Sequence, residues 1–462
     1  MNRRGWIASL SVGWFAATAL AADSASPPAG AAASERVSSA APALELTLAE
    51  ALTRAQASSA RLGALAALHG AAEAGLAQAQ AAHWPEVDLT AGYTHQSSVP
   101  ELAFALPGAS PETIFPNIQD NYRARASVGL PLYTGGRLSA AEEAARGESA
   151  ATAEDVRTGR ADVTLETTAA FWSLVTARES TAVLDRALAA FERHLTDAEA
   201  ARQVGMAARS DVLAVEVERD RATLARLDAQ NHSRVANADL TRLIGAAPTT
   251  RVDPQVPPAL PSPVATEVEA LVEQAYASRP EHVALVRRVE AARARVRAEE
   301  GAYWPQASFA AGYDEARPNR RILPQRDSWD SSWDVGVNVS LSVFDFGRTR
   351  AAVARARAQA DAAARQLEDL EARIRQDVTA RLTDLETALS AVPVAERALA
   401  SASENERVSA DRYREGVAPS SERLDAEVAL MRAGLDRTRA VAAAHLARAT
   451  FDRMLGAGAE GP

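Results

Sequence analysis

The segment HWPEVDLTAGY at residues 83–93 is the most informative about the fold, because it places a Trp-Pro break directly before a run in which apolar and polar residues alternate. Proline cannot continue a helix, and a period of two residues is typical of a β-strand with one apolar face. The same pattern returns at residues 303–313 as YWPQASFAAGY, 220 positions downstream. The two segments therefore predict equivalent helix-to-strand junctions, one in each half of the chain.

The equivalence of the two halves extends well beyond these junctions. Gly136 matches Gly347 and Gly205 matches Gly416 at an offset of 211, and no further gap is needed to the end of the repeat. The nine-residue difference between the two offsets falls within residues 93–128. The chain is accordingly divided into repeat 1, a proline-rich extended crossover and repeat 2, at residues 44–245, 246–266 and 267–456.

Each repeat is predicted to hold two strands with one apolar and one polar face. These strands are expected at about residues 84–95, 122–133, 304–315 and 332–345. Their length of roughly ten residues and the aromatic residues at their ends suit a membrane β-barrel, although a soluble sandwich would show the same alternation. Four strands cannot close a membrane barrel, since about eight is the smallest number known, so several chains would have to contribute.

The remaining parts of both repeats are rich in Ala, Leu and Arg and predict long helices. The predicted helices are residues 44–82, 137–204 and 206–245 in repeat 1, and the start of repeat 2, residues 348–415 and 419–456. Apolar residues spaced by alternating steps of four and three, such as Leu174, Leu184 and Phe191, predict coiled-coil packing on the longest helix. Pro393 lies inside the second long helix and is expected to kink or locally unwind it.

The N-terminal residues predict a secretory signal peptide followed by a flexible segment. Arg3 and Arg4 precede an apolar stretch that ends in Ala19-Leu20-Ala21, a cleavage pattern, so residues 1–21 are interpreted as a signal peptide and 22–43 as a flexible segment. An uncleaved inner-membrane anchor remains an alternative for this stretch. No later segment is apolar over about 18 residues, so no membrane-spanning helix is expected in the mature chain.

The composition excludes several classes of function. The 462 residues carry a net charge of -10 and no cysteine, and every basic residue is arginine or histidine. No disulfide, thiolate metal site or lipid-bearing cysteine is therefore possible, and nucleic-acid binding is not expected. The seven histidines are scattered, and Thr134-Gly135-Gly136-Arg137 is too short for a phosphate loop and predicts a strand-to-helix turn instead. The sequence thus predicts no enzyme, no metal and no cofactor.

The repeats, the Trp-Pro junctions and the segment from Tyr413 to Ala426 together resemble the TolC-like outer-membrane efflux factor family. The most specific likeness is YREGVA at residues 413–418 followed by Leu424-Asp425-Ala426. The resemblance covers nearly all of residues 44–456. It implies an α+β membrane protein: a trimer whose twelve strands form one β-barrel, continued by a helical coiled-coil tunnel in the periplasm.

The resemblance also implies roles for individual residues at the periplasmic tip. Glu422 and Asp425, one helical turn apart, match the carboxylates that ring the aperture, and a solvated acidic helix start is the plain alternative. Ser210, Asp211 and Tyr413 match the contacts that constrict the tip, whereas Ala418 stands where the family has an arginine. The turns that match the adaptor-binding surface contain Gly205, Met206, Ala207, Gly416, Val417 and Ala418. Arg123 and Arg125 lie on the polar strand face and are candidates for the barrel lumen.

The function implied by the resemblance is a passive exit channel in the outer membrane. A homotrimer would dock on a periplasmic adaptor and an inner-membrane pump of an efflux or type I secretion system, and the pump would supply the driving force. Two alternatives remain: a periplasmic coiled-coil adaptor that never enters a membrane, and an envelope scaffold without a conducting pore. The cargo is left open, because drug, metal-ion and protein exporters of this family share one plan.

Overall fold

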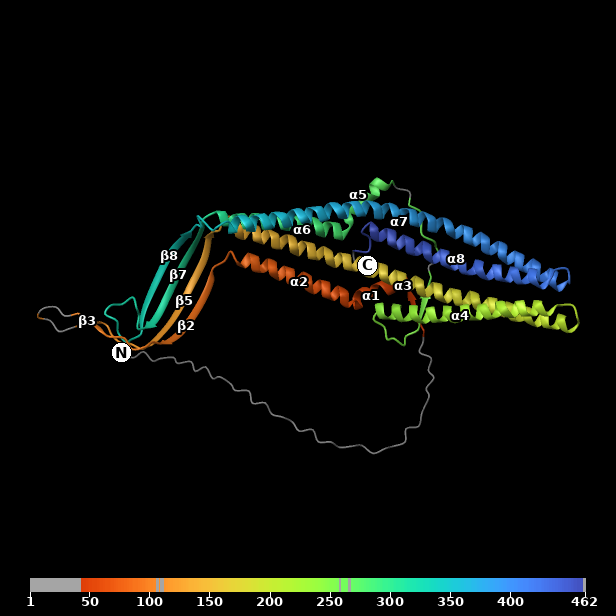
Figure 1. The fold of residues 1–462 in the computed structure, drawn as a ribbon, viewed down its shortest axis with the longest axis horizontal. Coiled ribbons are helices and arrows are strands. Elements are labelled where there is room, and N and C mark those ends of the chain that lie inside the picture. Colours follow the sequence, from red (N-terminus) through yellow and green to blue (C-terminus); the bar gives the residue numbers. More distant parts are fainter. Residues whose placement is uncertain (1–42, 105–107, 109–111, 257–258, 265–266, 460–462) are drawn as a thin grey trace, which may run out of the picture. The chain divides into compact units, whose positions relative to one another are not determined.

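The computed structural model describes residues 43–459, with gaps at 105–107, 109–111, 257–258 and 265–266. The predicted signal peptide and all but the last residue of the predicted flexible segment lie outside the described residues. The described chain from Ala43 onward forms one compact unit. A four-stranded sheet lies at one end of a set of long helices (Figure 1).

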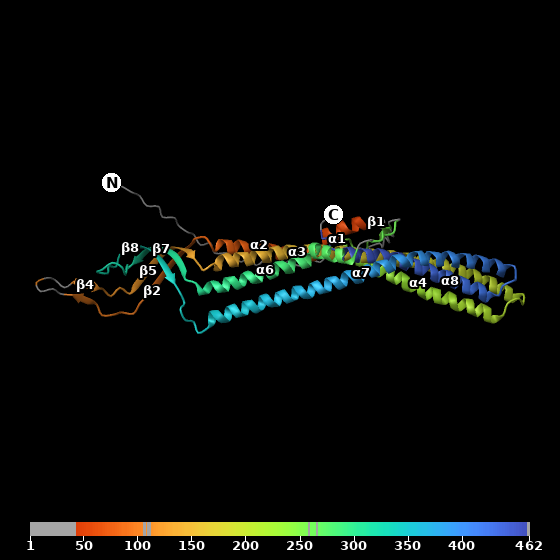
Figure 2. The ribbon, with the colours of Figure 1, turned by 90° about the horizontal axis from the view of Figure 1, so that it is seen from above.

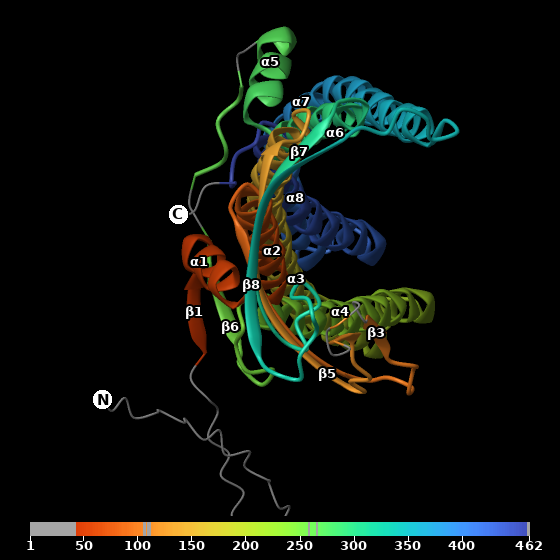
Figure 3. The ribbon, with the colours of Figure 1, turned by 90° about the vertical axis from the view of Figure 1, so that its left-hand side faces the viewer.

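The sheet contains β2 (Glu86–His95), β5 (Asp120–Tyr133), β7 (Gln306–Arg317) and β8 (Asp330–Ser340), in the order β2-β5-β7-β8. All neighbouring pairs are antiparallel, and the central pair, β5 and β7, joins the two repeats. The prediction of four strands in two equivalent halves is confirmed. Figure 3, which looks from the sheet toward the helices, shows that the sheet is curved.

One face of the sheet is apolar and uncovered within this chain. The side chains of Leu89, Trp333 and Val337 are 81%, 72% and 62% exposed. The register places Leu89 opposite Ala126, and Ala126 opposite Tyr313, so the apolar residues of neighbouring strands share this face. The opposite face carries Arg123, Arg125 and other polar residues. A large apolar face that remains exposed indicates a surface that something else must cover.

The long helices of the two repeats have equal lengths. Helices α3 (Arg137–Gln203) and α7 (Arg348–Arg414) each have 67 residues, and α4 (Arg209–Leu243) and α8 (Ser420–Met454) each have 35. Near the sheet, α3 is flanked by α2 (Ala60–Ala81) and α6 (Pro280–Glu300), and farther away by α4 and α8 (Figures 1 and 2). Shorter helices of both repeats thus lie along α3.

The predicted apolar stripe of α3 forms the core between the helices. Leu174 and Phe191 are completely buried and Leu184 is 2% exposed. Phe191 packs with Val215 of α4 and Leu424 of α8, which joins three helices near their far ends. In repeat 2, a corresponding cluster includes residues of α7, α8 and the short helix α5 (Val268–Ser278).

The prediction of one continuous helix over residues 44–82 is wrong. Residues Leu44–Thr47 form strand β1, and the helical stretch is divided into α1 (Leu48–Ser58) and α2. Thr47 and Glu50 form a capping box, while Ser59 is extended and its hydroxyl accepts a hydrogen bond from the Leu62 amide at 3.3 Å. Serine and threonine favour such caps because their oxygens satisfy free amides.

The crossover and the loops contain strands that the sequence did not reveal. Within the crossover, β6 (Val252–Gln255) is extended as predicted, but it also pairs in parallel with β1. The connection predicted as a loop at 96–121 contains the short pair β3 (Leu102–Phe104) and β4 (Glu112–Phe115). Conversely, β8 ends at Ser340 instead of the predicted residue 345, because its partner β7 begins opposite that residue.

Two further expectations concern helix continuity. Helix α7 passes through Pro393 without a break in its helical assignment, so the expected local unwinding is absent, and Val392 beside it is fully buried. Within the described ranges, no helix is both long enough and apolar enough to cross a membrane.

Candidate functional site

The chain reverses direction twice at the end of the unit that lies far from the sheet, at the turns after α3 and α7. Gly205 and Gly416 have positive φ values of 79° and 73°. Met206 donates its amide to Ala201 at 2.8 Å, and Val417 donates to Arg412 at 2.9 Å, so both helices end in the same Schellman geometry. Glycine permits these turns because it adopts a positive φ without steric strain.

The two turns expose apolar side chains. Met206 is 79% exposed and Val417 is 66% exposed, and both glycines are exposed. Ala207 is half-buried. Ala418 departs from the expectation, because it is 8% exposed and packed inside the turn. A buried methyl group cannot offer a contact surface, so Ala418 is removed from the candidate adaptor surface.

Of the three predicted constriction residues, Ser210 and Asp211 are joined by a hydrogen bond, whereas no hydrogen bond links Tyr413 to either of them among the described residues. Asp211 accepts a hydrogen bond from the Ala208 amide at 3.2 Å and thereby caps α4, and Ser210 lies 3.4 Å from the same carboxylate. The Tyr413 hydroxyl is buried and has no hydrogen-bond partner in the described part of the chain. Burial raises the pKa of Tyr413, and the nearby Arg423 opposes that shift.

A buried polar cluster, which we call the tip network, lies beside Tyr413 and joins α3 to α8. His194 is completely buried, and its Nδ1 and Nε2 lie 2.9 Å from Glu427 Oε2 and 3.0 Å from Ser420 Oγ. Arg423 donates from Nε to Glu427 Oε1 at 3.1 Å and from Nη1 to Asp197 Oδ2 at 2.8 Å. Each buried polar group of this cluster therefore has a partner, as burial requires.

Two residues of the tip network also contact the Tyr413 ring. The Arg423 guanidinium lies 5.2 Å from the ring centroid, and the His194 ring meets it edge-on at 5.4 Å. Sequence reasoning missed these residues. His194 and Glu427 are 233 positions apart on different helices, and only the packing of α3 against α8 brings them together.

The predicted aperture carboxylates lie in the first turns of α8. Glu422 forms an ion pair with Arg412 at the end of α7, and its side chain is 35% exposed. Asp425 is exposed and has no ion-pair partner among the residues that the structure describes. The two lie three residues apart on one side of α8, whereas Arg423 and Glu427 face the buried tip network.

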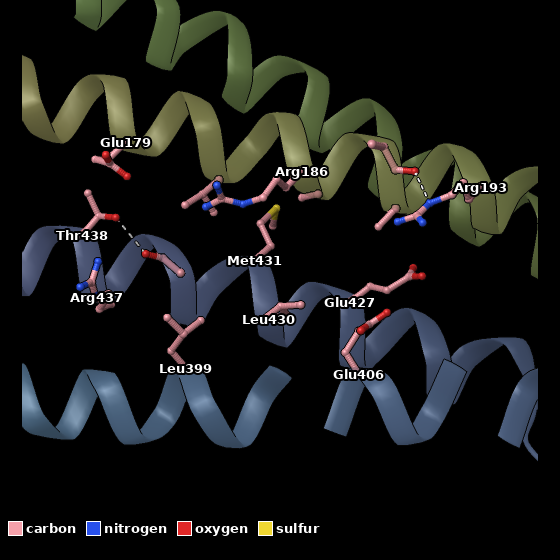
Figure 4. Close-up of a pocket in the computed structure, with 15 residues that line it drawn as sticks. Glu179, Arg186, Arg193, Leu399, Glu406, Glu427, Leu430, Met431, Arg437 and Thr438 are labelled. Atoms are coloured by element: carbon pink, nitrogen blue, oxygen red, sulfur yellow. Dashed lines mark hydrogen bonds between the residues drawn. The ribbon is translucent and has the colours of Figure 1, made fainter. Parts of the chain in front are cut away.

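A cavity of about 430 Å³ lies next to the tip network, between α3, α7 and α8 (Figure 4). Its lining includes Glu179, Arg186, Arg193, Glu406, Met431 and Arg437. Glu427, which belongs to the tip network, also contacts this cavity. No group of three or more potential metal ligands occurs in the described portion of the chain. The cavity offers mixed charges on a helical surface and no arrangement of nucleophile and base.

The candidate lumen residues lie in a second cluster, which we call the strand network, on the polar face of the sheet. Arg123 Nε donates to Asp314 Oδ1 at 2.7 Å, and Arg125 donates to both oxygens of Asp334 at 3.0 Å. Arg125 also contacts Asp314. The structure thus brings both predicted arginines together, with two carboxylates that the sequence analysis did not single out.

Comparison with known proteins agrees with this architecture. The family model described as "Outer membrane efflux protein" matches residues 51–246 and 271–457, one segment in each repeat. The curated protein "Outer membrane efflux protein BepC" of Brucella suis biovar 1 (strain 1330) is 25% identical over 281 residues. That alignment covers 59% of this chain and 59% of BepC, so the matched stretch spans less than two thirds of the relative.

Solved structures share the fold over most of their length. The outer-membrane channel OprN matches with a TM-score of 0.75 and 20% identity, over 88% of this chain and 89% of that chain. The outer membrane protein VceC from Vibrio cholerae matches with a TM-score of 0.75 and 19% identity, over 89% and 97%. The Neisseria gonorrhoeae MtrE outer membrane channel matches with a TM-score of 0.74 and 18% identity, over 89% of each chain.

Proposed function

The chain belongs to the outer membrane efflux protein family, with the TolC-like fold, and from that premise we propose that it is the outer-membrane exit channel of an efflux system. It would conduct substrate passively across the outer membrane and the periplasm. A relative and several solved structures of the same fold are named as outer-membrane channels or efflux proteins, which supports this assignment.

The observation that carries the proposal is the sheet. Its outer strands β2 and β8 each have one unpaired edge within the described chain, and its apolar face is exposed. Unpaired edges and exposed apolar surface are unfavourable in water and are both removed when a sheet closes into a barrel within lipid. Three copies supply twelve strands, so we propose a homotrimer with the apolar face toward lipid and the helices in the periplasm.

The exposed turns at Gly205 and Gly416 support docking to partner proteins at the opposite end. Met206 and Val417 offer apolar contacts on helix-to-helix turns, which suits recognition by another helical hairpin. We propose that these turns contact a periplasmic adaptor and that an inner-membrane pump supplies the energy. The cargo is then selected by the pump.

Site-directed labelling tests whether the sheet end reaches the cell surface. The chain has no cysteine, so single cysteines can be introduced without background. Val99→Cys, in the β2–β5 connection, replaces a 57% exposed valine, and Val204→Cys, at the far turn, replaces a 71% exposed valine. A membrane-impermeant maleimide should label only the first on intact cells and both after lysis. Labelling of neither variant on intact cells would favour the periplasmic adaptor.

Single-channel recording in planar bilayers tests conduction and the aperture. The wild type should give discrete, cation-selective steps, and Glu422→Gln/Asp425→Asn should weaken that selectivity, because a narrow ring of carboxylates attracts cations. Glu404→Gln/Asp436→Asn removes two exposed carboxylates on the same helix pair and is the matched control. Absence of conductance in trimeric, detergent-purified protein would contradict the channel and leave the scaffold alternative.

A further inference from the structure

The strand network contains a close contact between the Arg125 side chain and the backbone of Gly312, which has no side chain. A Cβ on Gly312 would lie 2.2 Å from Arg125 Nη2 and 2.5 Å from Cζ, distances that real atoms do not adopt. Gly312 pairs directly with Asp334 on β8, so the Arg125 guanidinium reaches Asp334 by lying across the glycine. The absence of a side chain at Gly312 therefore leaves room for the Arg125 guanidinium on the polar face.

The connection between β7 and β8 brings two further arginines to the same place. Asn319 is 4% exposed and donates from Nδ2 to the Asp330 carbonyl at 2.9 Å and to Ser332 Oγ at 3.1 Å. Its Oδ1 accepts the Arg321 amide at 3.0 Å. The buried amide thus anchors the turn that carries Arg320 and Arg321 beside the strand network.

The charges at this place do not balance. Arg321 lies 3.2 Å from Asp334. The two carboxylates of Asp314 and Asp334 therefore form ion pairs with three arginines, Arg123, Arg125 and Arg321. Arg320 has no hydrogen bond or ion pair within the part of the chain that the structure describes. Four guanidinium groups against two carboxylates leave an excess of positive charge and of unused donors.

These arginines surround a cavity of about 500 Å³ on the polar face. Asp314 is the acidic residue of its lining, and its side chain is 7% exposed and held by two arginines. The other lining groups include the hydroxyls of Thr90, Thr94 and Ser332 and the amide of Asn121. The charged groups of the lining are therefore predominantly arginines, and its acidic residue is already paired with two of them.

We propose that this cavity binds the oxyanion group, a carboxylate, sulfonate or phosphate, of a small solute. The planar guanidinium matches such groups with two parallel hydrogen bonds, and Arg320 is free to supply them. The inference rests on the proposed function only for its location, because the polar face would line the barrel lumen in the assembled channel. The channel would then carry an anion-binding site at the sheet end and carboxylates at the far turns.

Binding of a defined anionic probe tests the proposal on the full-length protein in detergent. The probe is pyranine, a fluorescent trisulfonate, followed by fluorescence anisotropy at low and high salt. The wild type should bind it saturably, and Arg320→Gln should weaken binding by about fivefold or more, because the charge-assisted hydrogen bonds of the guanidinium are lost. Gly312→Ala should also weaken binding, since it displaces Arg125.

Arg326→Gln is the matched control. Arg326 lies in the same connection, is exposed, and is not part of the cavity lining. The change of net charge equals that of Arg320→Gln, so a general attraction of the probe would be reduced equally in both variants. Equal weakening in the two variants, or no saturable binding by the wild type, would overturn the proposal.

Bilayer recordings on the same preparations separate this proposal from the proposed function. If the protein conducts, but Arg320→Gln and Arg326→Gln bind the probe equally, the channel proposal stands and the anion site is rejected. If the protein does not conduct, but binds the probe saturably and in a way that depends on Arg320, the anion site stands and the channel proposal is rejected. Sulfate should compete with pyranine if the oxyanion itself is recognised, and failure to compete would count against the site.

Discussion

The tip network and the strand network are both clusters of charged residues, but they differ in their access to water. In the tip network, the side chains of His194 and Glu427 are 0% and 2% exposed. In the strand network, those of Arg123 and Arg125 are 61% and 26% exposed. Charges removed from water depend strongly on their partners, whereas charges that retain water depend on them weakly.

The two clusters also differ in how completely their hydrogen bonds are used. Both nitrogens of His194 have partners within the tip network, and Arg423 bonds to both Glu427 and Asp197. The strand network borders a cavity and, together with Arg320 and Arg321 beside it, has more arginines than carboxylates. The comparison indicates that the tip network holds α3 and α8 together, whereas the strand network has donors left for a ligand.

The largest effect is expected from breaking the tip network. Glu427→Gln keeps the side-chain volume but removes the negative charge that His194 and Arg423 share, which should destabilise the protein by about 3 kcal/mol. Thermal unfolding followed by circular dichroism should show a clearly lower Tm. Glu404→Gln, which removes the exposed partner of Arg407, should change stability by less than about 1 kcal/mol. Equal Tm values for both variants would show that burial of the tip network has no energetic consequence.

A smaller effect is expected from the glycine beneath Arg125. Gly312→Ala places a Cβ against the flexible end of Arg125, which must move away from Asp334, so the expected cost is that of a partly exposed ion pair, about 1 kcal/mol. Gly336→Ala on β8 is the control, because a Cβ there meets nothing within 4 Å. The loss of stability should appear as a lower temperature at which the folded protein changes its mobility on gels run under mildly denaturing conditions. If both alanine variants behave alike, Gly312 is an ordinary strand residue and the packing argument fails.

Removing an exposed arginine from the strand network should have a still smaller effect. Arg123→Gln is expected to lower stability by less than about 1 kcal/mol, because water and salt screen this ion pair. The loss should vanish in about 1 M salt, where the screening length is about 3 Å. The loss caused by Glu427→Gln should persist under the same conditions, and the opposite pattern would reverse the comparison between the two networks.

The smallest expected effect is the alkaline titration of Tyr413. Burial raises the pKa of this hydroxyl above its ordinary value of 10.0. Above pH 10 the unfolded tyrosine loses its proton before the folded one does, so the stability contributed by this group falls as the pH rises through the folded pKa. The difference in phenolate absorbance between the wild type and Tyr413→Phe reports the titration of Tyr413. This difference should therefore appear only above pH 10. Tyr303→Phe, at a 52% exposed position, controls for the loss of any tyrosine, and a Tyr413 midpoint at or below 10 would contradict the prediction.

Local patterns in the sequence predicted the parts of the fold that depend on neighbouring residues. The strand alternation after Trp84 and Trp304, the turns at Gly205 and Gly416 and the coiled-coil stripe of α3 all arise from short-range constraints on the backbone. The internal repeat then placed these elements in two equivalent halves. The break at Ser59 was missed although a serine cap signals it, because the helical composition on both sides concealed it.

The two repeats, the four strands, the long helices and the family resemblance were all predictable from local patterns, because periodicity and turn residues act over a few positions. Which charged residues meet depended instead on the packing of whole helices and strands. It buried His194 with Glu427, placed Ala418 inside its turn, and laid Arg125 across Gly312. These contacts join residues that are far apart in the chain, and their burial and partners depend on how whole helices and strands pack.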